Sequence, residues 1–151
     1  CQKFRDESIS RIKREKPDAV IMTGMQPFTA PNSDISSRDW WLKGEAIAYS
    51  RIKNQTKFPI YLSDTPLPQV DIPSCVAEAK GNECDTSRPV SPEVAPGLIP
   101  INPTPWLCDS SCPAVIDEIV VYRDKSHLSV AMSEYLAPFL AKELKRIGVI
   151  R

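Results

Sequence analysis

The chain has 151 residues, which is enough for one domain with a hydrophobic core, and its apolar and charged fractions are ordinary for a globular protein. Its 19 lysines and arginines balance its 19 aspartates and glutamates, and no apolar run is long enough to span a bilayer. The composition therefore argues against nucleic-acid binding and against membrane insertion of this segment.

Hydrophobic periodicity and helix-ending residues predict alternating helices and strands. Such alternation is typical of an α/β layer fold. The expected elements, in chain order, are a helix over 6–16 that ends at Pro17, a buried strand over 18–23 closed by Gly24, a helix over 40–53 with Trp41, Ala48 and Ile52 on one face, and strands over 58–62 and 119–122.

Ser129 is expected to cap a last helix. Pro138 lies inside this helix and is expected to kink it. The predicted apolar face consists of Met132, Leu136, Phe139, Leu140 and Ile147.

Proline is concentrated in the middle of the chain. Of the 15 prolines, 11 fall between Pro59 and Pro113. This density predicts a long, stiff loop excursion at about 64–113 rather than a run of regular elements.

The five cysteines indicate an oxidising compartment. Pairing by proximity predicts the disulfides Cys75–Cys84 and Cys108–Cys112 and leaves Cys1, whose partner would lie upstream. A zinc site, or buried free thiols in a cytosolic protein, are the alternatives.

The clearest chemical signal is the segment Asp124–Ser129, which contains the only histidine, His127, three residues after Asp124. A histidine acts as general base on a serine hydroxyl when an acceptor holds its second ring nitrogen, and Asp124 is placed to be that acceptor. The strand expected over 119–122 would deliver both residues to the sheet edge where ligand sites collect. A purely structural hydrogen-bonded pair is the alternative.

The nucleophile that should accompany this base is missing, because the sequence has no Gly-x-Ser-x-Gly elbow and no Gly-Asp-Ser block. The chain starts at Cys1, without an initiator methionine or a signal peptide. We therefore expect residues 1–151 to be the C-terminal portion of one larger domain whose serine lies upstream, and we expect this portion alone to be inactive.

Several segments together resemble an SGNH-type hydrolase domain, and more narrowly the SGNH domain fused to bacterial membrane acyltransferases of the acyltransferase-three family. Among them, the Asp-x-x-His-Leu-Ser block is fairly specific in such a context. The segments that carry the resemblance are 62–66, 71–75, Trp106-Leu107-Cys108, Cys112-Pro113, Val121–Ser129 and Leu136–Leu140.

The resemblance implies a three-layer α/β/α sandwich with a central parallel sheet, in which His127 is the base and Asp124 orients it. It also implies an oxyanion hole, in which Gly24 would keep a backbone role and Gln26 would replace the family's asparagine; a loop cap is the alternative role for Gln26. The implied reaction needs no metal or cofactor.

The implied activity is transfer of an acyl group, expected to be acetyl, through a serine ester to a hydroxyl of an envelope glycan or glycolipid. The domain would lie outside the cytoplasm, tethered to the membrane, and a fused membrane domain would deliver the acyl donor. A secreted carbohydrate esterase and a non-catalytic binding module of the same fold are the alternatives. Three tryptophans could line an acyl or sugar pocket, although we expect core packing for Trp40, Trp41 and Trp106.

Overall fold

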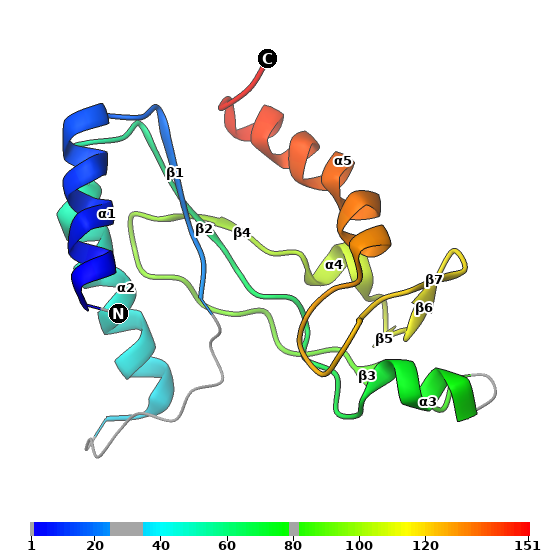
Figure 1. Ribbon diagram of the computed structural model, residues 1–151. Coiled ribbons are helices and arrows are strands. Elements are labelled where there is room, and N and C mark those ends of the chain that lie inside the picture. Colours follow the sequence, from blue (N-terminus) through cyan, green and yellow to red (C-terminus); the bar gives the residue numbers. More distant parts are fainter. Residues whose placement is uncertain (1, 25–34, 79–81) are drawn as a thin grey trace. The chain divides into compact units, whose positions relative to one another are not determined.

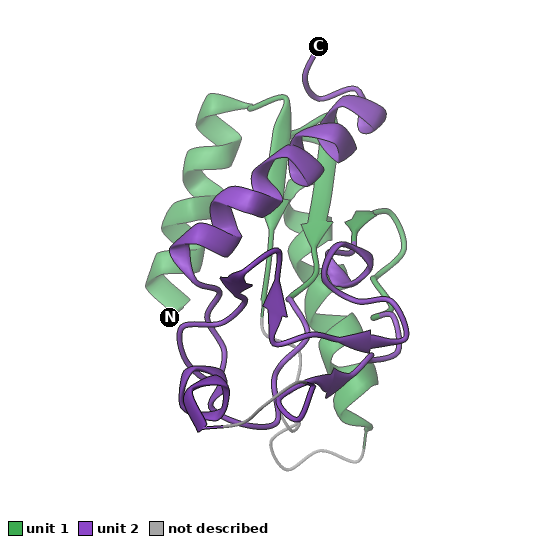
Figure 2. Cartoon of the chain, turned by 90° about the vertical axis from the view of Figure 1, so that its right-hand side faces the viewer, with its two compact units in different colours: residues 1–64, 92–101 green, residues 65–91, 102–151 purple. Residues whose placement is uncertain are grey.

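The computed structural model describes residues 2–24, 35–78 and 82–151, and the chain divides into two compact units (Figure 2). The first unit comprises residues 1–64 and 92–101, and the second comprises residues 65–91 and 102–151. Each unit is therefore assembled from two separate stretches of sequence. None of the helices in the described ranges is long and apolar enough to cross a membrane.

A parallel three-stranded sheet lies beside the two helices of the first unit (Figure 1). The two helices of this unit precede the first two strands and pack against each other. Parallel strands that alternate with helices are the α/β arrangement expected from the sequence. In the order of the sheet the strands are β1 (Ala19–Met22), β2 (Phe58–Leu62) and β4 (Ile99–Ile101), and the helices are α1 (Gln2–Glu15) and α2 (Ser37–Ile52).

The first helix and strand differ from the expectation in extent and in burial. α1 begins at Gln2 rather than near Asp6, and its first turn contains a hydrogen bond from the Arg5 guanidinium to the Gln2 side-chain oxygen (2.9 Å). β1 is not a buried strand, because the Ile21 side chain is 46% exposed. The strand lies at the edge of the described sheet and so has a neighbour on one side only.

α2 turns one face toward the interior of the first unit. The Ser36 hydroxyl caps this helix by accepting a hydrogen bond from the Asp39 N–H (3.0 Å). On the inner face, Trp41 donates its indole N–H to the hydroxyl of the buried Tyr61 (3.2 Å), and Ile52 is buried. The predicted inner face of this helix is correct, whereas Trp40 lies partly exposed rather than in the core.

The third strand of the parallel sheet is β4, which lies outside the strands expected from the sequence. Its central residue, Pro100, has no N–H for a strand ladder and normally argues against a strand. β4 occupies an edge of the described sheet, where Ile99 and Ile101 pair with Ile60 and Leu62. The proline hides this strand in the sequence. Its edge position in the described sheet explains why the proline is tolerated.

Residues 119–122 were expected to form a sheet strand, and this expectation is wrong for the described sheet. β7 (Ile119–Val120) instead pairs antiparallel with β6 (Val115–Ile116) in the second unit. Asp117 and Glu118 form the turn between them, with φ values of 47° and 64°, the two positive values that a type I′ hairpin requires. Ile119 and Val120 thus pair with a strand that is adjacent in sequence, and not with the parallel sheet.

The second unit consists of short elements around one hydrophobic core. The proline-rich segment contains several of them, contrary to the expected irregular excursion, although each is brief. Besides the hairpin, the elements are α3 (Ile72–Glu78), β3 (Thr86–Ser87), α4 (Thr104–Leu107), β5 (Ser111–Cys112), which pairs antiparallel with β3, and α5 (Val130–Ile147). The buried residues of the core are Ile72, Cys84, Leu107, Cys108, Cys112, Ala114, Val121, Tyr122, Met132 and Leu136.

Two disulfides, Cys75–Cys84 and Cys108–Cys112, join the cysteine pairs expected from the sequence. They span sequence separations of 9 and 4 residues, and closing loops of this size stabilises a fold by about 2–3 kcal/mol each on chain entropy alone. Their pairing does not fit the zinc or free-thiol alternatives. Cys1, the expected unpaired cysteine, lies outside the described residues.

The last helix, α5, begins where the sequence predicted. The Ser129 hydroxyl accepts a hydrogen bond from the Met132 N–H (3.1 Å), and the helix ends at Gly148 in a left-handed cap with φ of 88°. Met132 and Leu136 are buried in the core of the second unit. The helix continues through Pro138, which lies exposed.

Two glycines of the first unit allow a matched test of the packing. Gly97 has φ of 96°, and an added Cβ would lie 2.4 Å from the Tyr49 ring, whereas a Cβ at Gly44 in α2 would meet nothing within 4 Å. We expect Gly97→Ala to lower the free energy of unfolding by about 1–3 kcal/mol. Gly44→Ala should raise it by about 1 kcal/mol, because alanine favours the helix. Urea denaturation measures both changes, and a Gly97→Ala variant as stable as the parent would contradict the packing described.

Candidate active site

The predicted catalytic residues lie in a five-residue loop, 123–127, that is closed at its neck by backbone pairing. Tyr122 and Leu128 form an antiparallel bridge. Just inside it, the Arg123 N–H donates to the His127 carbonyl (2.9 Å). The loop is therefore held at both ends immediately before and after the residues of interest.

Within the loop, the Asp124 carboxylate organises the backbone. Its Oδ1 accepts hydrogen bonds from the N–H groups of Ser126 and His127, both at 2.8 Å. An aspartate that bonds to the backbone two and three residues ahead forms a tight local turn. The same carboxylate meets the His127 ring, with Nδ1 lying 2.9 Å from Oδ2 and 3.0 Å from Oδ1.

These hydrogen bonds change the acidity of Asp124. The N–H groups of His127 and Ser126, followed by the imidazole, lower the pKa of Asp124 from 3.8 to about 2 because they stabilise the charged carboxylate. Partial burial opposes the shift and does not overcome it. Asp124 is therefore an anion throughout the physiological pH range.

The geometry assigns different roles to the two nitrogens of His127. When Nδ1 donates its proton to Asp124, Nε2 carries the lone pair and is the nitrogen that can accept a proton. The His127 side chain is 65% exposed, so a reacting hydroxyl has access to it. The expected Asp–His hydrogen bond is present, and its orientation is that of a general base with its carboxylate partner.

The Ser126 hydroxyl lies close to this imidazole, yet its position does not suit a nucleophile. Its Oγ lies 3.3 Å from Nδ1 of His127 and 3.5 Å from Oδ1 of Asp124. Both distances place it beside the nitrogen that Asp124 already engages. Ser126 is therefore not placed to give its proton to Nε2.

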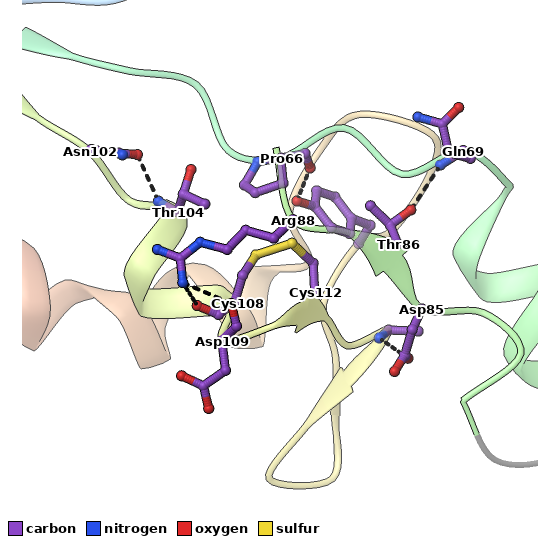
Figure 3. The surroundings of a disulfide bond; sticks show 12 residues. Pro66, Gln69, Asp85, Thr86, Arg88, Asn102, Thr104, Cys108, Asp109 and Cys112 are labelled. Atoms are coloured by element: carbon purple, nitrogen blue, oxygen red, sulfur yellow. Dashed lines mark hydrogen bonds between the residues drawn. A yellow bond between two sulfur atoms is a disulfide. The ribbon is translucent and has the colours of Figure 1, made fainter. Parts of the chain in front are cut away.

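A disulfide-braced framework supports the loop from within the same unit (Figure 3). The Arg88 guanidinium donates to the carbonyls of Cys108 (3.3 Å) and Asp109 (2.7 Å), and so fixes one end of the Cys108–Cys112 disulfide. Arg88 lies 20 positions before Cys108 and 21 before Asp109. No local sequence pattern predicts contacts over such a separation.

The framework reaches the loop neck through three further hydrogen bonds. The Asp85 carboxylate, labelled in Figure 3, accepts a hydrogen bond from the Ala114 N–H (3.0 Å). The Ala114 carbonyl in turn accepts from the Val121 N–H (2.9 Å), and the Val121 carbonyl accepts from the Ser129 N–H (2.9 Å). The cap of α5 and the start of the loop are thereby joined to the disulfide region.

Of the two predicted oxyanion residues, Gly24 is described and Gln26 lies outside the described residues. Gly24 follows β1 in the first unit, whereas Asp124 and His127 belong to the second. A Cβ at Gly24 would come within 2.8 Å of the Trp41 ring, so this position has a packing reason to be glycine.

We expect the carboxyl group of Asp124 to titrate with a midpoint near pH 2. Because its pKa is lowered in the folded protein, the stability that it contributes is fully present above pH 4 and is lost as the pH falls through about 2. Carbon-13 NMR of the aspartate carboxyl groups measures this midpoint, with Asp124→Asn identifying the signal. A midpoint at or above 3.8 would show that the backbone N–H groups do not hold the carboxylate.

A comparison with protein families identifies the family to which this chain belongs. Residues 1–142 match the model of the SGNH domain that is fused to AT3 domains, the family expected from the Asp-x-x-His-Leu-Ser block. No curated protein matches the chain, and no solved structure does. The match covers most of the 151 residues. The chain therefore belongs to the family of SGNH domains fused to AT3 domains, and it is a domain of the esterase and acyltransferase type.

Proposed function

We propose that this chain is part of the extracytoplasmic SGNH domain of a cell-envelope O-acyltransferase. The acyl group, which we take to be acetyl, would pass through a serine ester to a hydroxyl of a glycan or glycolipid. The observation that carries the proposal is the His127–Asp124 pair, which engages Nδ1 and leaves Nε2 as a base on an exposed side chain. Two disulfides support a location in an oxidising compartment.

In the first half of the proposed reaction, Nε2 of His127 takes the proton of a serine hydroxyl as its oxygen attacks the acyl carbonyl of the donor. The bond between the carbonyl carbon and the donor's leaving group breaks, and the imidazolium returns the proton to that group. Asp124 stabilises the imidazolium, and its low pKa keeps it charged while it does so. The serine would come from a segment that this sequence does not contain.

In the second half, Nε2 takes the proton of an acceptor hydroxyl, whose oxygen attacks the serine ester. The ester bond to the serine breaks, and the proton returns to the serine oxygen. A sugar hydroxyl as acceptor gives transfer, whereas water gives hydrolysis. An AT3 membrane domain would supply the acyl donor, and backbone N–H groups, including that of Gly24, would stabilise the oxyanion together with Gln26.

We expect His127→Ala to reduce kcat of the full-length protein by at least about 10³-fold, because both half-reactions lose their base. Acyl release from an activated ester, and acyl transfer to a sugar hydroxyl followed by mass spectrometry, measure the two outcomes. Lys125→Ala, a change of an exposed side chain in the same loop, is the matched control and should keep its activity within a few-fold.

Three results discriminate between the candidate functions. Equal activity of His127→Ala and the parent protein would reject His127 as the base. Acyl release without any transfer to sugars would favour a carbohydrate esterase. Sugar binding without acyl release would favour the non-catalytic binding module.

A further inference from the structure

Tyr122 connects the catalytic loop to a distant segment of the second unit. Its side chain is 5% exposed, and its hydroxyl donates a hydrogen bond to the carbonyl of Pro66, which lies 56 positions earlier in the chain. Tyr122 is also the last residue before the loop and forms the bridge to Leu128. One residue thus combines a contact with the loop neck and a contact with a remote anchor.

The anchor is suited to hold a fixed position. Pro66 has no backbone N–H, and its carbonyl is a buried acceptor that requires a donor. The Tyr122 hydroxyl supplies this donor. Pro68 follows two residues later, so two fixed φ angles stiffen the segment that receives the bond.

Movement of Tyr122 would reach His127 by a short route. The Tyr122–Leu128 bridge flanks the hydrogen bond from the Arg123 N–H to the His127 carbonyl. His127 also donates its own N–H to Asp124 within the loop. Since the neck and the interior of the loop share these hydrogen bonds, a displaced neck shifts the imidazole relative to its carboxylate.

We propose that Tyr122 is a positioning residue for the His127 base and that it acts through the hydrogen bond from its hydroxyl to the Pro66 carbonyl. The inference rests on the proposed function, because it assigns Tyr122 to the same reaction. Tyr122 does not touch the reacting atoms. Its contribution is to keep Nε2 aligned, and small misplacements of a catalytic group have large effects on rate.

The test is Tyr122→Phe in the full-length protein, which keeps the buried ring and removes only the hydroxyl. We expect kcat to fall about tenfold or more while KM changes by less than about twofold, since alignment of the base affects chemistry rather than substrate binding. The midpoint of the Asp124 carboxyl should also rise from about 2 toward 3.8, because the loop N–H groups are held less firmly.

Two control variants separate this effect from general loosening. Tyr135→Phe removes another tyrosine hydroxyl, one that donates to Asp117 (2.8 Å), and should leave kcat unchanged. Met132→Ala destabilises the same core without removing a hydroxyl, and a melting curve shows how far. A fall of kcat in Met132→Ala as large as that in Tyr122→Phe would overturn the inference.

Failure of the inference and failure of the proposed function give different results. If His127→Ala is inactive and Tyr122→Phe keeps the parent kcat, the positioning role is wrong and the function stands. If His127→Ala keeps the parent activity, the proposed function is wrong, and the positioning role is overturned with it.

Discussion

The candidate site depends on one carboxylate. Asp124 accepts two backbone N–H groups and also faces the imidazole of His127, so it shapes the loop and orients the base at the same time. The two tasks support each other. Hydrogen bonds from the backbone keep the carboxylate charged, and a charged carboxylate is what an imidazole needs when it takes up a proton. A histidine without such a partner could rotate freely on an exposed loop.

The surroundings of the loop explain how an exposed base can nevertheless be rigid. Val121 and Tyr122 on one side and Met132 and Leu136 on the other belong to one hydrophobic core, and Cys84, Cys108 and Cys112 belong to the same core. Burial fixes the residues at both ends of the loop, while the loop itself stays in solvent. A small unit with short strands has little regular structure for this purpose, and its two disulfides compensate for that lack.

How much could be predicted from the sequence depended on the range of the interactions. The Asp124–His127 contact, the Ser129 cap and the strands β1 and β2 follow from local spacing or periodicity, and all of them were predicted. β4 was hidden by Pro100, because a proline in the middle of a three-residue segment argues against a strand. The hairpin of β6 and β7 was missed because its turn, Asp117-Glu118, lacks the glycine that usually marks type I′ turns. Long-range bonds, such as those from Tyr122 to Pro66 and from the Ala95 N–H to the buried Glu45, have no local signature.

The division of the chain has a consequence for its assembly. The polypeptide leaves the first unit after Asp64, returns to it at Pro92, and leaves it again after Ile101. No contiguous fragment consists of one unit alone, because the stretch that joins the two parts of each unit belongs to the other unit. β4 can join β2 only after the intervening stretch, with its Cys75–Cys84 crosslink, has been looped out. Pairing of β4 with β2 therefore closes a loop that carries residues 65–91 of the second unit, so the chain's topology ties the sheet to the unit that holds the base.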